Sequence, residues 1–188
     1  MKWERTSKKE LFWKARLPLK IKIFLWYLKR GVILTKDNLL KRKWKGDAKY
    51  NLCGLVENIQ HLFFECRVAR SVWNTLFIAF NIQPPMSISH MFGSWIRSFA
   101  PGLRKQVLVG IAAICWILWL NRNDAMFQNK IANSFLQVIF RGTFWIRQWL
   151  LSKEEERRML IDGCKELEGV ALHFFGSGGW KSQRRIGP

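Results

Sequence analysis

Acidic residues are scarce in this sequence, and they do not gather in pairs. It has 13 Asp and Glu against 32 Lys and Arg, and the only adjacent acidic residues, Glu154 to Glu156, lie in a charged stretch that favours a helix. Two-metal phosphoryl chemistry requires paired carboxylates held close together. We therefore expect that the chain is not an enzyme.

The shortage of acids leaves a formal net charge of +19, concentrated at the front of the chain. Residues 1–50 hold 16 basic and 4 acidic side chains, a surplus of 12. A positive field of this density attracts polyanions, among which nucleic acid is the most common partner. An anionic membrane surface and a merely solvated basic face are the alternatives.

Cysteines are also few, and a signal segment is missing. The four cysteines, at 53, 66, 115 and 164, do not form the dense framework of a secreted domain, and the start MKWERTSKKE has no apolar run. We expect an intracellular protein, nuclear or cytoplasmic and not secreted.

Long hydrophobic runs are absent as well. The longest uncharged apolar stretch, Val107 to Leu120, has 14 residues, whereas a bilayer span needs ~20. Its length predicts a buried core helix. A membrane-associated protein anchored through 107–120 is the alternative.

Helical periodicity is what the chain does have. Apolar residues recur every three or four positions from His61 to Phe80, and Leu19 to Arg30 is framed by Pro18 and Gly31. The pattern predicts a mainly α-helical fold. A small zinc-knuckle-like Cys/His turn is expected around Cys53, where a short β-hairpin remains open.

Three residues have spacing typical of a metal site. Cys53, His61 and Cys66 supply thiolate and imidazole, the donors that zinc prefers, but a structural site closes four positions. Tyr50 stands where a Cys-x-x-Cys pair would have its first cysteine, and a phenol keeps its proton to about pH 10. Asp47, water or Cys164 are candidates for the fourth donor. The alternative is that both cysteines are simply buried and His61 caps a helix.

A short basic helix precedes this turn. Thr35 is placed to cap a helix over Lys36 to Lys43, with Leu39 and Leu40 facing inward. We expect Lys41, Arg42, Lys43 and Lys45 to contact phosphates. Trp44, a ring among cations, is either a platform for an unpaired base or a packing residue.

These residues resemble a known family. WKARLPLKIKIFLWYLKRGVILTKDNLL and LCGLVENIQHLFFECRVARSVW are similar to the reverse transcriptase zinc-binding domain of plant LINE-type non-LTR retrotransposons, over about Phe12 to Trp73. WILWLNRNDAMFQNK, from Trp116 to Lys130, resembles the segment that in such elements joins this domain to the next part of the polyprotein.

The resemblance implies a domain that helps to hold template RNA or target DNA. The ligand pattern of the family falls on Cys53, His61 and Cys66, and its first cysteine falls on Tyr50. Zinc is the implied cofactor and would stabilise the fold. A decayed element fragment with no selected function is the alternative.

We expect four segments along the chain. They are a basic leader (1–11), a domain like the reverse transcriptase zinc-binding domain (12–80), a helical C-terminal region (81–169) and a flexible basic tail (170–188).

Overall fold

The computed structural model describes residues 11–128, 134–149 and 154–176, and these residues are mainly helical. Nearly all of the predicted leader and the tail beyond residue 176 lie outside the described residues. The elements in order are α1 (Leu11–Lys14), α2 (Leu19–Lys29), α3 (Lys36–Lys41), the π-helical turn η2 (His61–Glu65), α4 (Arg67–Phe80), α5 (Ile88–His90), the π-helical turn η3 (Met91–Trp95), α6 (Arg104–Phe127), α7 (Phe135–Gln148) and α8 (Glu154–Phe175). The mainly α fold is confirmed.

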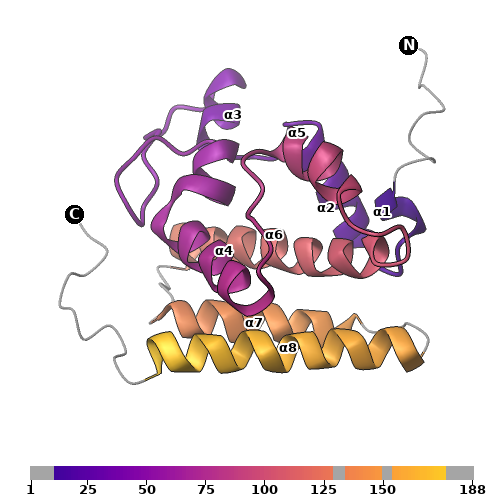
Figure 1. The fold of residues 1–188 in the computed structure, drawn as a ribbon. Coiled ribbons are helices and arrows are strands. Elements are labelled where there is room, and N and C mark those ends of the chain that lie inside the picture. The colour runs from indigo at the N-terminus through magenta and orange to yellow at the C-terminus, as the bar shows by residue number, and fades with distance from the viewer. Residues whose placement is uncertain (1–10, 129–133, 150–153, 177–188) are drawn as a thin grey trace, which may run out of the picture.

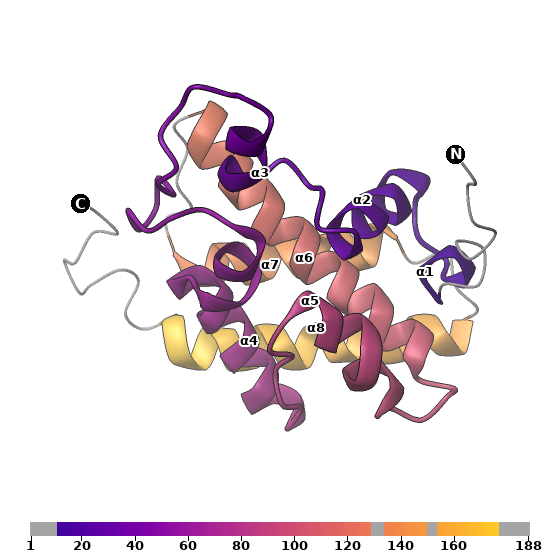
Figure 2. The ribbon, with the colours of Figure 1, turned by 90° about the horizontal axis from the view of Figure 1, so that it is seen from above.

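Helix α6 is the centre of the molecule. In Figure 1, α7 and α8 run side by side on one side of α6, and α1, α2, α3 and α5 lie on the other. Seen from above, α6 crosses beneath α2 and α3 (Figure 2). The two layers bury a continuous apolar core, whose removal from water drives the packing.

The apolar run 107–120 lies within α6. By length and composition this helix could cross a membrane, and 61% of its most apolar window is buried inside the protein. Leu108, Ala112, Cys115 and Leu118 are buried among the other helices. The burial supports the prediction of a core helix.

Two predicted helices end differently from what the periodicity indicates. The run from His61 to Phe80 is broken at Cys66, whose backbone is extended (φ −65°, ψ 155°) between η2 and α4. The break lets the Cys66 sulfur cap α4, so a capping interaction overrides the apolar stripe. Helix α8 continues to Phe175, past residue 170, where the sequence predicts that the tail begins.

The turn between residues 48 and 57 is the most irregular described segment. Lys49 and Val56 form a single antiparallel bridge, and the described residues contain no strand. Gly54, with φ +71°, allows the chain to reverse, because a side chain is strained in this left-handed conformation. The open β-hairpin alternative is therefore realised only as one bridge.

Candidate metal centre and nucleic-acid interface

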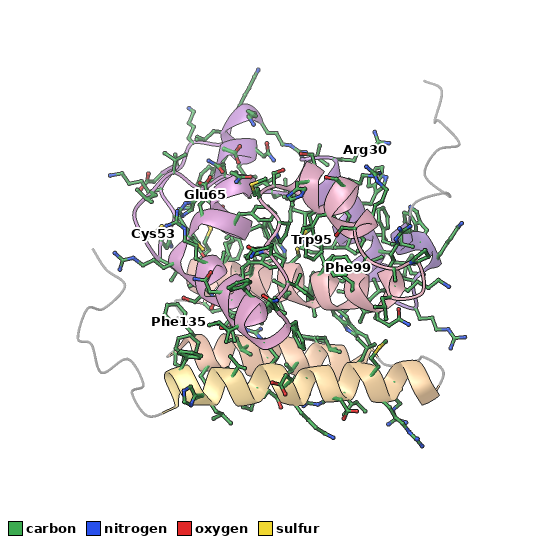
Figure 3. The ribbon with its side chains drawn as sticks, in the orientation of Figure 1. Arg30, Cys53, Glu65, Trp95, Phe99 and Phe135 are labelled. Atoms are coloured by element: carbon green, nitrogen blue, oxygen red, sulfur yellow. The ribbon has the colours of Figure 1, made fainter. Side chains whose placement is uncertain are left out.

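The predicted zinc donors gather around the turn that comes after Lys49. The backbone amides of Cys53 and Gly54 both donate to the Tyr50 carbonyl, which closes the turn at 3.2 and 2.8 Å. This places the Cys53 Sγ 3.0 Å from His61 Nε2 at the start of η2. Figure 3 shows Cys53 at the edge of the molecule, close to Glu65 at the end of η2.

His61 is set up as a neutral imidazole. Its ring is buried, and burial lowers its pKa from 6.5 because the charged form loses its water. Its backbone amide donates to Asn58 Oδ1 at 2.8 Å, which fixes the start of η2. A neutral ring nitrogen can bond the Cys53 thiol, and it is also the form that binds metals.

Cys66 has a structural role at the start of α4. Its sulfur accepts a hydrogen bond from the Ala69 amide at 3.3 Å and donates one to the Leu62 carbonyl at 3.6 Å. Burial raises the pKa of the thiol to about 11. Cys66 is therefore a protonated N-cap of α4 at neutral pH, whereas a zinc ligand must be a thiolate.

Tyr50 occupies the position of the first cysteine in the family pattern. The side chain is 1% exposed, and its ring stands edge-on to His61 with centroids 5.9 Å apart. Burial holds its pKa well above the ordinary value of 10. A neutral buried phenol is packed beside His61 and offers no anionic donor.

The side chains as they lie do not fit a closed zinc site. Within residues 11–128, 134–149 and 154–176, no group of three or more His, Cys, Asp or Glu side chains is placed to hold a metal. Of the proposed fourth donors, Asp47 Oδ1 accepts from the Lys49 amide, and Cys164 lies in α8 facing the Thr143 carbonyl. Cys53 and His61 are paired, and Cys66 is engaged elsewhere. Zinc binding stays a prediction.

The basic cluster, defined as Lys41 to Lys45, is exposed along its whole length. Helix α3 ends at Lys41, and Lys43 has a positive φ of +67°, so the chain turns sharply here. Lys41 pairs with Asp37 at 3.2 Å, across one helical turn. The turn thus presents consecutive cationic side chains to solvent.

Trp44 is folded back within this cluster. Its ring lies against Gly46 so closely that a Cβ built there would stand 1.9 Å from the indole. The side chain nevertheless remains 39% exposed. One part of the ring is thus held by the chain, and another part is accessible to a ligand.

Two expectations about α3 are wrong. Leu40 is 39% exposed rather than inward, because α3 is only six residues long and Leu39 is its half-buried partner. Thr35 stands at the N-cap position but makes no side-chain capping bond. Its hydroxyl donates to Asp37 Oδ1 instead, and the Lys36 amide donates to Glu57 Oε1 at 2.9 Å.

Glu57 and Arg122 form a buried ion pair that sequence reasoning missed. Their side chains are 0% and 2% exposed, and Glu57 Oε1 accepts from Arg122 Nε at 3.0 Å and Nη2 at 2.7 Å. The guanidinium also donates to the Leu34 carbonyl and stacks over Trp119, 4.9 Å from the ring centroid. The pair fixes the start of α3 to α6.

The partners are 65 residues apart, and no periodicity relates them. One signal does exist, because Arg122 lies within the segment WILWLNRNDAMFQNK, which resembles the family outside its zinc-binding part. That resemblance marks Arg122 but does not identify its partner.

Comparison with known proteins supports the family resemblance at the front of the chain. Residues 1–73 match a family described as zinc-binding in reverse transcriptase. The match ends at Trp73, where the resemblance seen in the sequence also ends. No curated protein and no solved structure matches the chain.

Proposed function

We propose that this chain is a non-catalytic nucleic-acid-binding protein whose N-terminal part derives from a retrotransposon reverse transcriptase of the LINE type. The observation that carries the proposal is the exposed basic cluster at the end of α3. Phosphate groups are bound by exposed Lys and Arg side chains, and such contacts position a protein on nucleic acid without reading its sequence.

The cluster is mounted on the core rather than on a free loop. Glu57 bonds the first amide of α3, and Arg122 holds Glu57 from α6. A cationic surface held at a fixed place loses less conformational entropy when it binds than a disordered tail does. This support favours a retained binding surface over a decayed fragment.

The environments of several acidic side chains support a non-catalytic role. Glu57 is buried against Arg122, Glu168 is paired with Arg147 at 2.8 Å, and Asp124 is paired with Arg141. These carboxylates neutralise nearby guanidinium groups. Each of them is committed to an ion pair rather than to a second carboxylate.

The test is a quadruple variant, Lys41→Ala/Arg42→Ala/Lys43→Ala/Lys45→Ala, with affinity measured by fluorescence anisotropy over a range of salt concentrations. Losing four phosphate contacts should lower the slope of log affinity against log salt by about 3. The matched control removes four exposed cations elsewhere, Arg67, Arg70, Lys105 and Lys165, so that both variants lose the same charge. Equal affinity of the two variants would contradict the assignment.

A further inference from the structure

A second basic surface lies at the other end of the same side of the molecule. A groove of about 630 Å³ opens between the C-terminal end of α2 and the segment formed by α5 and η3. Its lining, taken over the described residues, includes three cationic side chains, Lys29, Arg30 and Arg97, and no acidic one. In Figure 3, Arg30 stands at the upper edge of the molecule, beside α5.

The groove combines an apolar lining with polar groups. Ile59, Ile88 and Phe92 are half-buried and supply apolar surface, and Gln60 and Ser89 add an amide and a hydroxyl. Its volume is within the usual range of about 300 to 1,000 Å³ for sites that enclose a small ligand or part of a larger one. Cations beside apolar surface match the two chemistries of a nucleotide, its phosphate and its base.

Aromatic rings continue this surface along α2. The Arg30 guanidinium stacks on Trp26, 5.3 Å from the ring centroid, and Trp26 contacts the exposed Tyr27 edge-on at 5.1 Å. Aromatic rings interleaved with cations are typical of surfaces that bind unpaired bases, because every base has a face on which a ring can stack.

We infer that this groove, defined by Lys29, Arg30, Arg97, Ile59, Ile88 and Phe92, binds a nucleotide of a single-stranded nucleic acid. The base lies on the apolar lining and the phosphate is held by the cations. A duplex keeps its bases stacked and offers the groove only backbone, so the apolar lining would stay unused. The inference rests on the proposed function and specifies its substrate as single-stranded.

The two surfaces face the same way. Helices α2 and α3 both lie on the side of α6 that is turned away from α7 and α8 (Figures 1 and 2). A single strand that contacts the basic cluster at α3 can therefore continue across the molecule to the groove at the end of α2. The cluster supplies general phosphate attraction, and the groove supplies preference for unpaired bases.

The test compares the full chain with Arg30→Ala/Arg97→Ala and with the charge-matched control Arg67→Ala/Arg70→Ala. Each is titrated with a single-stranded RNA of roughly 12 nucleotides, a length within the site sizes of such proteins, and with a duplex of the same sequence. We expect the groove variant to bind the single strand roughly tenfold more weakly, with duplex binding close to that of the control. Arg30→Lys/Arg97→Lys should recover most of the loss.

Circular dichroism and melting temperature equal to wild type establish that the groove variant is folded. Equal loss on strand and duplex, or no loss on either, would overturn the groove assignment while leaving the proposed function standing. Adenosine monophosphate that competes as well as the strand would overturn a nucleic acid as the occupant. If the wild type binds neither probe, the proposed function itself fails, and the groove inference fails with it.

Discussion

His61 illustrates how single residues replace a metal in the turn around Cys53. Its imidazole bonds the Cys53 thiol at 3.0 Å and has the ring of Tyr50 at its edge. Hydrogen bonds and aromatic packing thus hold together the side chains that a zinc ion would otherwise join. The spacing in the sequence correctly brings Cys53 and His61 together, but it does not reveal that Tyr50 is packed beside them.

The lowered pKa of His61 predicts a pH dependence of stability. The unfolded chain has the higher pKa and therefore takes up a proton first as the pH falls, so the free energy of unfolding is full above about 6.5 and decreases below it. Urea unfolding between pH 7.5 and 5 measures this decrease. His61→Gln should show a weaker decrease over the same range, and an identical decrease in both proteins would contradict the role of the buried ring.

Among the elements, α4 begins because of one sulfur atom. The apolar stripe from His61 to Phe80 predicts the helical content of this region, but the stripe cannot show that the chain becomes extended at Cys66. The cap is a local bond between the Cys66 sulfur and the Ala69 amide. Cysteine is an uncommon N-cap, and for this reason the pattern gives no signal for it.

A pair of substitutions at Cys66 separates capping from metal binding. Cys66→Ser retains a capping atom and should keep most of the stability, whereas Cys66→Ala should lower the free energy of unfolding by about 1 kcal/mol. Chemical denaturation of both variants, each with a chelator and with added zinc, is the measurement. If serine costs as much as alanine and the loss depends on zinc, Cys66 is a metal ligand and the capping account is wrong.

At the scale of the whole molecule, the Glu57–Arg122 pair joins the family-matched front to the central helix. Residue 57 lies inside the matched range 1–73, and residue 122 lies well beyond it. The predicted segments 12–80 and 81–169 therefore share a buried ion pair in the structure. Sequence patterns describe each helix from its neighbours along the chain, so a contact over 65 residues is outside what they can predict.

Removing one partner of this pair should be costly. Arg122→Met leaves the Glu57 carboxylate buried without its cation, which should lower the free energy of unfolding by about 3–5 kcal/mol. The double variant Glu57→Gln/Arg122→Met, which buries no charge, should recover part of this loss. Urea denaturation tests both proteins, and an Arg122→Met protein as stable as the wild type would contradict the anchoring of α3.

The central claim is that the chain binds nucleic acid through fixed cationic surfaces, and one titration tests it most directly. The full protein, dialysed against a chelator, is titrated with a single-stranded RNA at several salt concentrations. We predict binding that survives chelation and weakens linearly in log affinity against log salt, because phosphate contacts release counterions. Absence of binding at low salt, or binding that does not respond to salt, would contradict the account.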